Sequence, residues 1–199
     1  MRSGRLGTQC AEFFKGIQVK IDPEGGKLNY ILSVKDLQDG RINFNGIREE
    51  QIVIPKSKGR LALRQDDLII TLRGTSFKAA VFNPEDQYPN GRQYIGRTYP
   101  DENLACFRLN WHQPRIIAAY LNSPVGQQYL EMMSTGTRVK SLSLKSLENM
   151  RMPMVPLEIQ QELSRFLDSA DRYLQEIEEE KQTLTSACNA VIGTYMEGY

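Results

Sequence analysis

The chain has 199 residues, of which 40% are hydrophobic and 25% are charged, a composition typical of a folded, soluble protein rather than a disordered one. Its length allows one sizeable core with an appendage, but excludes a large enzyme with separate catalytic and specificity domains. No apolar run approaches the ~20 residues of a membrane-spanning helix, and residues 1–10 lack the apolar stretch of a signal peptide. The 3 cysteines lie far apart and fit neither a disulfide framework nor a zinc knuckle, so we expect a cytoplasmic protein that does not bind membranes.

Charge is divided unevenly along the chain. Residues 1–156 carry 22 Lys and Arg against 15 Asp and Glu, a net charge of +7, whereas residues 157–199 carry 3 against 9, a net charge of −6. A basic body of this kind favours a polyanionic partner. The alternative is a solvated acidic helix attached to a mildly basic domain, and charge alone favours the two equally.

Four short apolar runs with β-branched or aromatic residues, each bounded by turn residues, predict strands. These runs are residues 28–35, 67–73, 78–82 and 104–109. Residues 83–101 differ, because they contain three prolines, two glycines and three tyrosines, and they predict a long loop. Long ordered loops more often serve a function than merely connect elements.

From Trp111 the pattern changes and predicts short helices. Their apolar faces cover residues 116–121 and 125–133, and Ser143 can cap a third. Pro114 and Pro124 suit the first position of a helix, Ser123 can cap the second one, and Gly136 can end it. An extended segment, residues 150–156, follows.

The last segment carries a seven-residue repeat. After Pro156, one series is Leu163, Ala170, Ile177, Leu184 and Val191, and the complementary series is Leu167, Leu174, Lys181, Cys188 and Tyr195. Alternating spacings of four and three place both series on one narrow stripe, which predicts a coiled-coil seam. Roughly 36 helical residues would make a rod of about 54 Å, which needs a partner for its stripe. The alternative is that the helix folds back over its own domain. Lys181 is a polar interruption that can fix register.

Support for catalysis is weak. The chain has no G-x-S-x-G, P-loop or H-E-x-x-H motif, and no G-x-G-x-x-G after a strand. We expect a structural role for the single histidine, His112. Residues 83–86 (Asn-Pro-Glu-Asp) lack the aromatic residue with which amino-methyltransferases stack a flipped base. Asp66 and Asp67 would point to opposite faces of a strand, so they predict a turn rather than a metal site. We therefore expect no catalytic residue, no metal and no cofactor.

Basic residues gather in four segments, and contact with double-stranded DNA is the favoured interpretation. The expected contact residues are Lys56, Lys58, Arg60 and Arg64; Arg73, Thr75 and Lys78, with Ser76; Asn90, Arg92, Gln93 and Arg97; and Arg138 and Lys140. The first segment is expected to contact mainly phosphates. Arg suits guanine edges and Asn or Gln suits adenine edges, so the third segment is the expected base-reading element. Alternatively, the basic loops are ordinary surface and the tyrosines of the third segment pack it down.

The order of motifs resembles the specificity (S) subunit of type I restriction–modification systems, over essentially the whole chain. Residues 6–16 are similar to the opening helix of that family, which ends in a glycine. The block "Y-I-x-x-x-D-L-x-x-G-x-I" is matched by Tyr30, Ile31, Asp36, Leu37, Gly40 and Ile42. The block "L-x-x-G-D-I-L-I-x-x-x-G-x-x-x-K" is matched by Asp67, Ile69, Ile70, Gly74 and Lys78, with Asp66 in place of the usual glycine. Residues 118–130 match the helix pair "Y-L-x-S-x-x-G-Q", and residues 134–168 match the closing stretch with its prolines.

The resemblance implies an α+β fold, with a β-rich target-recognition domain with short helices over residues 1–153. A long C-terminal coiled-coil helix would cover residues 154–199. Family members usually carry two recognition domains joined by two antiparallel helices, bind a bipartite DNA site, and recruit methyltransferase (M) and restriction (R) subunits that do the chemistry.

One domain and one helix make this chain look like half of such a subunit. A second S-subunit copy is therefore expected to pair through the C-terminal helix, so that the two copies bind inverted half-sites around a spacer. The alternatives are a recognition fragment of a single-chain restriction–methyltransferase, or a purely structural coiled-coil interaction protein.

Overall fold

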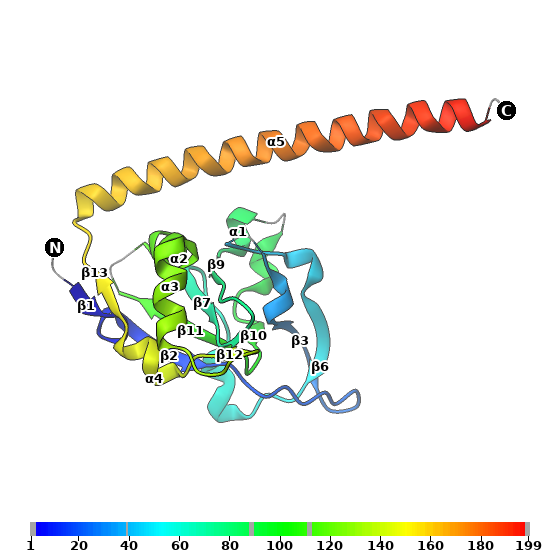
Figure 1. Ribbon diagram of the computed structural model, residues 1–199. Helices are drawn as coiled ribbons and strands as arrows, with labels where there is room; N and C mark the ends of the chain where they lie inside the picture. The colour runs from blue at the N-terminus through cyan, green and yellow to red at the C-terminus, as the bar shows by residue number, and fades with distance from the viewer. Residues whose placement is uncertain (1–2, 39, 88–89, 111–112, 198–199) are drawn as a thin grey trace. The chain divides into compact units, whose positions relative to one another are not determined.

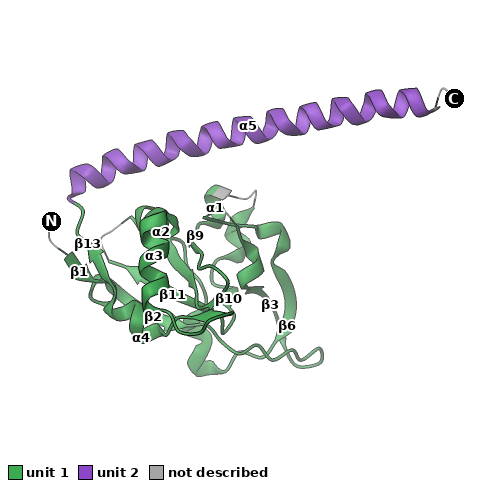
Figure 2. Cartoon of the chain, viewed as in Figure 1, with its two compact units in different colours: residues 1–155 green, residues 156–199 purple. Residues whose placement is uncertain are grey.

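A computed structural model describes residues 3–38, 40–87, 90–110 and 113–197 (Figure 1). The structural role predicted for His112 therefore lies outside the described residues, as does Tyr88 of the predicted long loop. The chain divides into two compact units, residues 1–155 and residues 156–199 (Figure 2). The first unit holds every strand of the described residues, and the second is a single helix.

The centre of the first unit is an antiparallel four-stranded sheet with the order β2-β11-β7-β9. Its strands are β2 (Cys10–Lys15), β11 (Leu104–Leu109), β7 (Asp67–Thr71) and β9 (Ala79–Phe82). In a three-stranded sheet, β3 (Lys27–Leu32) pairs in parallel with β10 (Thr98–Pro100) and antiparallel with β6 (Arg48–Ile52). Two-stranded antiparallel pairs join β1 (Ser3–Arg5) to β13 (Arg151–Pro153), β4 (Leu37–Gln38) to β5 (Arg41–Ile42), and β8 (Arg73–Gly74) to β12 (Lys140–Ser141).

Five α-helices occur among the described residues. They are α1 (Pro84–Gln87), α2 (Pro114–Asn122), α3 (Pro124–Met133), α4 (Leu144–Asn149) and the long α5 (Leu157–Glu197). Short 3-10 helices are η1 (Leu6–Gln9), η2 (Val34–Asp36), η3 (Phe44–Gly46), η4 (Lys56–Leu61) and η5 (Gly91–Tyr94). None of the helices in the described part of the chain is both long and apolar enough to cross a membrane.

The helix caps follow the sequence prediction. The side chains of Ser123 and Ser143 accept hydrogen bonds from backbone N–H groups in the first turns of α3 and α4, at 3.2 and 3.0 Å. The prediction that Gly136 ends α3 is wrong. That helix ends at Met133, where the Ser134 N–H bonds the Glu131 carbonyl at 3.1 Å and begins an extended segment.

The four-stranded sheet is buried on both faces, which explains why its strands are continuous apolar runs. On β7, Leu68 and Ile70 belong to one core cluster and Ile69 to the other. The first cluster includes Ile117 and Leu130, so α2 and α3 cover that face (Figure 1). The second cluster includes residues of β3, so the three-stranded sheet packs on the opposite face. Each fully buried Leu or Ile contributes about 1.5–3 kcal/mol.

The opening helix expected at residues 6–16 is wrong. The segment forms η1 and then strand β2, in which Phe13 and Phe14 lie opposite Phe107 and Cys106 of β11. The rings of Phe13 and Phe107 stack with their centroids 5.8 Å apart. Pairing with a strand more than 90 residues away overrides the local tendency, and this is a tertiary effect that a short window of sequence does not contain.

The long loop expected at residues 83–101 is also wrong in part, because the segment contains α1, η5 and strand β10. Tyr94 and Tyr99 are buried, which confirms for these two residues the alternative that the tyrosines pack the segment down. Gly91 allows η5 to approach α1, since a Cβ atom there would lie 1.8 Å from the Pro84 carbonyl oxygen. The four predicted strands, the two predicted helices and the long C-terminal helix are confirmed.

Candidate nucleic-acid interface

The first basic segment, residues 56–64, consists of η4 and the three residues that follow it. The side chains of Lys56, Lys58 and Arg64 are exposed and make no hydrogen bond or ion pair with any residue that the structure describes. Arg60 is also exposed, but its guanidinium forms an ion pair with Glu12 on β2. Three of the four predicted cations of this segment are therefore available to an external anion.

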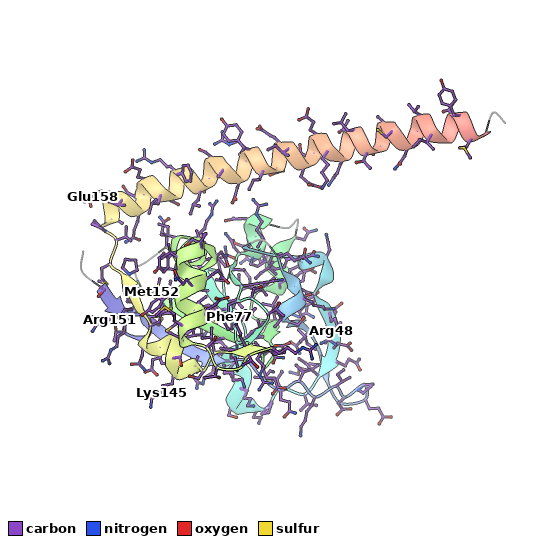
Figure 3. All side chains as sticks on the ribbon, viewed as in Figure 1. Arg48, Phe77, Lys145, Arg151, Met152 and Glu158 are labelled. Atoms are coloured by element: carbon purple, nitrogen blue, oxygen red, sulfur yellow. The ribbon has the colours of Figure 1, made fainter. Side chains whose placement is uncertain are left out.

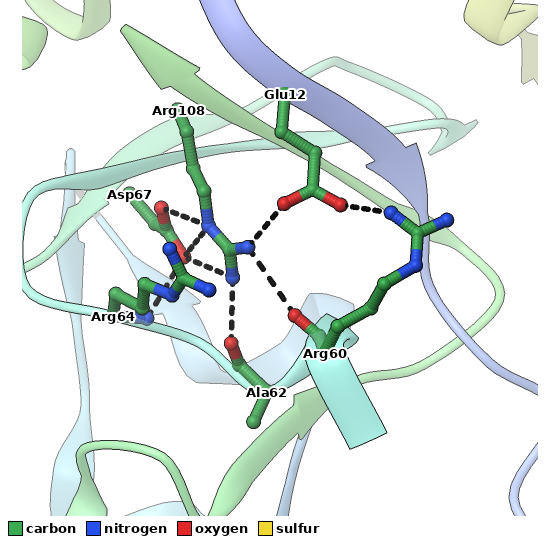
Figure 4. Close-up of polar contacts among 6 residues, drawn as sticks. All are labelled: Glu12, Arg60, Ala62, Arg64, Asp67 and Arg108. Atoms are coloured by element: carbon green, nitrogen blue, oxygen red, sulfur yellow. Dashed lines mark hydrogen bonds and ion pairs between the residues drawn. The ribbon is translucent and has the colours of Figure 1, made fainter. Parts of the chain in front are cut away.

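A buried guanidinium fixes the backbone that carries this segment (Figure 4). The Arg108 side chain on β11 is only 8% exposed, and its Nη1 donates to Glu12 Oε2 at 2.6 Å and to the Arg60 carbonyl at 3.2 Å. Its Nη2 donates to the Ala62 carbonyl at 2.6 Å, and its Nε donates to Asp67 Oδ1 at 3.1 Å. We call Glu12, Asp67 and Arg108 the arginine clamp.

The arginine clamp holds residues 60–67 at both ends, because Arg108 bonds the carbonyls of Arg60 and Ala62 and the side chain of Asp67. Asp67 also accepts the Arg64 backbone N–H at 2.8 Å. Burial raises the pKa of Asp67, and its bonds with the Arg64 N–H and Arg108 offset this only in part. Burial lowers the pKa of Arg108, but its bonds with Asp67 and Glu12 raise that pKa more, so the guanidinium stays charged. Asp66 precedes the strand in a left-handed conformation with φ 67°, so the predicted turn is confirmed.

Sequence reasoning missed Glu12 and Arg108. The available signal was an arginine within the apolar run of residues 104–109, since a charge in a buried strand needs a partner. Its acidic partners lie 96 and 41 residues away, so no local pattern could have named them.

The third segment holds its residues in two different states. Asn90, Arg92 and Gln93 are exposed around the start of η5, and Asn90 adopts φ 62°. The side chains of these three residues make no hydrogen bond or ion pair with a described residue. Arg97 is engaged within the fold. Its Nη2 donates to the Leu28 carbonyl at 3.0 Å and lies 3.6 Å from a carboxylate oxygen of Glu49.

The structure brings the second and fourth segments together. Strand β8 pairs with β12 so that Gly74 lies opposite Lys140 and Arg73 opposite Ser141. Arg73, Thr75 and Arg138 are exposed. Lys78 and Lys140 are engaged: Lys78 Nζ donates to the Leu37 carbonyl at 2.7 Å, and Lys140 Nζ donates to Glu131 at 2.6 Å.

The first and third segments are also adjacent, through backbone hydrogen bonds. The Leu63 N–H bonds the Thr98 carbonyl at 2.8 Å, and the Gly96 N–H bonds the Leu63 carbonyl at 2.9 Å. The four segments thus lie in two adjacent pairs, the first beside the third and the second beside the fourth. We call these two pairs the basic surfaces. No group of three or more His, Cys, Asp or Glu side chains within the described ranges could hold a metal ion.

Most side chains of the predicted stripe on helix α5 are exposed. Leu174, Ile177 and Leu184 are 59%, 60% and 61% exposed, and Leu163 and Val191 are exposed as well. Lys181 Nζ lies 3.1 Å from Glu178, and this contact lowers the pKa of Glu178. Leu167 and Ala170 are half-buried.

Comparison with known proteins agrees with this combination of a β-rich basic unit and a long helix. The family model described as the type I restriction modification DNA specificity domain matches residues 24–186. The chain is 25% identical to the EcoBI type I restriction enzyme specificity subunit of Escherichia coli over 159 residues, which are 80% of this chain and 32% of that protein.

Two solved structures share the fold. The HsdS subunit of Thermoanaerobacter tengcongensis matches with a TM-score of 0.59 at 16% identity, over 88% of this chain and 43% of that one. The type I restriction–modification S subunit of M. genitalium matches with a TM-score of 0.53 at 14% identity, over 88% and 40%. The chain belongs to the family of type I restriction–modification DNA specificity domains. It spans less than half of the length of each of these relatives.

Proposed function

We propose that the chain is a sequence-specific DNA-recognition module of a type I restriction–modification system. The observation that carries the proposal is the family match over residues 24–186, which includes all four basic segments. Residues 1–153 would be the target-recognition domain, and residues 154–199 the helix that joins two such domains.

Double-stranded DNA is the proposed ligand of the two basic surfaces. Phosphate contacts are proposed for Lys56, Lys58 and Arg64. These exposed cations can bind phosphate oxygens, which are the same for every DNA sequence. Asn90, Arg92 and Gln93 carry the donors and acceptors that match base edges. Arg60, Lys78, Arg97 and Lys140 would act mainly through the internal contacts that the structure gives them.

A second copy of the chain is the proposed partner of α5. The exposed stripe repeats every seven residues over more than four heptads, and an antiparallel pair would bury it along its full length. Two identical recognition domains related by a twofold axis would bind inverted half-sites around a spacer. M and R subunits would then act on the DNA that the dimer has bound.

The chain would have no catalytic activity of its own. Two of its thiols are poor nucleophiles, because desolvation raises the pKa of the half-buried Cys10 to about 12 and that of the buried Cys106 well above its ordinary value. With S-adenosylmethionine, ATP, magnesium and DNA, the purified chain should neither methylate nor cut. Turnover without added subunits would contradict this part of the proposal.

A salt titration of DNA binding tests the proposal. We expect the logarithm of the binding constant for a fluorescent 30-base-pair duplex to fall linearly with the logarithm of the salt concentration. The same titration tests one alternative, because a purely structural coiled-coil protein would show no such binding. A recognition fragment of a single-chain enzyme would bind DNA but would stay monomeric in sedimentation experiments.

A further inference from the structure

Two loops of the body are paired into one element, which we call the basic ribbon and define as residues 72–78 and 135–142. Residues 72–78 form the tip of the hairpin between β7 and β9. Residues 135–141 form a second hairpin, closed by paired hydrogen bonds between the backbones of Thr135 and Ser141 at 2.9 and 2.8 Å. Strands β8 and β12 pair the two hairpins with each other.

The base of the basic ribbon is fixed in place. Leu72, Phe77 and Leu142 are buried in the core cluster under α2 and α3, and Figure 3 labels Phe77 within the body. The Leu142 N–H bonds the Leu72 carbonyl at 2.9 Å, and the Thr71 N–H bonds the Lys78 carbonyl at 2.9 Å. The backbone on such a base loses little conformational entropy when the ribbon binds a ligand.

Turn geometry keeps the tips tight. At Gly74 a Cβ atom would lie 2.8 Å from the Ser76 carbonyl oxygen, and Gly136 adopts φ 95°. The other side chains at these tips are exposed: Arg73, Thr75, Ser76, Thr137, Arg138 and Val139.

Two charges on the basic ribbon, those of Arg73 and Arg138, are uncompensated. Residues 68–84 and 132–147 contain no Asp or Glu. The ammonium groups of Lys78 and Lys140 are used at the base of the ribbon, by Leu37 and Glu131. Neither the Arg73 guanidinium nor the Arg138 guanidinium makes a hydrogen bond or an ion pair with a residue that the structure describes.

The chemistry of these exposed groups matches the base edges of the major groove. Two guanidinium groups can each bond guanine O6 and N7, three hydroxyls can bond any base, and the Val139 methyl groups can contact the thymine methyl. The groove is about 12 Å wide and admits a two-stranded ribbon. The third segment offers less, because Arg97 is held by Leu28 and Glu49 and because Glu85 and Asp86 lie near its start.

We propose that the basic ribbon is the principal base-reading element of the chain, with Arg73 and Arg138 as its specificity-determining residues. This inference rests on the proposed function, since it assigns a task within the proposed DNA interface. In this proposal the two paired hairpins of the body contact base edges, and the η4 segment contacts phosphates.

The test is selection of preferred sequences from a pool of duplexes with a randomised core, using the full chain and its Arg73→Gln and Arg138→Gln variants. Glutamine suits adenine where arginine suits guanine. Each variant should therefore change the preferred base at one or two positions of the selected sequence. Each variant should bind the sequence selected by the wild type about 5- to 150-fold more weakly, and random DNA with a much smaller loss.

Arg48→Gln is the matched control. Arg48 is an exposed arginine on β6 that precedes Glu49 and Glu50, and Figure 3 labels it away from Phe77. The Arg48→Gln substitution removes the same charge as each ribbon variant and should leave the selected sequence unchanged. If the wild type selects a sequence and both ribbon variants select the same one with equal affinity, the inference is overturned and the proposed function stands. If the wild type selects no sequence, both fail.

Discussion

The body and the long helix present their surfaces in different ways. In the body, exposed cations sit on loops that are fixed by groups far away in the chain, as Arg108 of β11 fixes the segment that carries Lys58 and Arg64. In α5, the exposed stripe follows from a local repeat alone. The body has a net charge of +7 and a buried core, whereas the residues after 156 have a net charge of −6 and expose their apolar side chains. The proposed surface for a polyanion and the proposed surface for a second chain therefore lie on separate units.

The largest expected effect is loss of self-association in Leu174→Asp. An antiparallel dimer would bury the new carboxylate once per chain, at a cost of several kcal/mol each. Sedimentation should show a monomer with an unchanged unfolding profile of the body. Gln175→Asp adds the same charge beside the stripe and should remain dimeric. A wild type that is already monomeric at micromolar concentration would refute the dimer.

A smaller loss is expected when the arginine clamp is broken. Arg108→Met leaves the buried Asp67 carboxylate without its cation, which should lower the free energy of unfolding of the body by about 3–5 kcal/mol. Urea denaturation measures this change. The exposed Arg64→Met should stay within about 0.5 kcal/mol of the wild type. Equal stability of the two variants would show that the clamp does not hold the loop.

Phosphate contact predicts a weaker and non-selective effect. Lys56→Ala and Lys58→Ala should reduce affinity for every duplex alike and lower the salt slope by about 0.9 per lost contact. Lys145→Ala, on α4 outside the four basic segments, is the control and should keep the slope of the wild type. Unchanged slopes for Lys56→Ala and Lys58→Ala would place the phosphate surface elsewhere.

The smallest expected effect concerns the turn before β7. Asp66 adopts φ 67°, a conformation that glycine enters without a steric penalty. Asp66→Gly should stabilise the body by about 0.5 kcal/mol, and Asp66→Ala should destabilise it. Thermal unfolding compares the two. If Asp66→Gly proves no more stable than Asp66→Ala, backbone strain does not govern this turn.

The sequence predicted those features that depend on neighbouring residues. The repeat after Pro156 gave α5, apolar runs gave β7, β9 and β11, and serine caps gave α3 and α4. Strands β2 and β6 were missed, since β6 (Arg-Glu-Glu-Gln-Ile) has no apolar run and becomes a strand by pairing with β3. In the candidate site, residue types identified the exposed cations, but only the structure shows that Arg60, Lys78, Arg97 and Lys140 are engaged within the fold.

The separation of a reading body from a pairing helix can be tested in a single measurement. The wild type and the Leu174→Asp variant are each used to select duplexes from the same randomised pool. We expect the wild type to select two inverted copies of one short sequence at a fixed spacing, and the variant to select a single copy. Selection of the same sequence by both proteins would contradict the account, and so would the absence of any selected sequence.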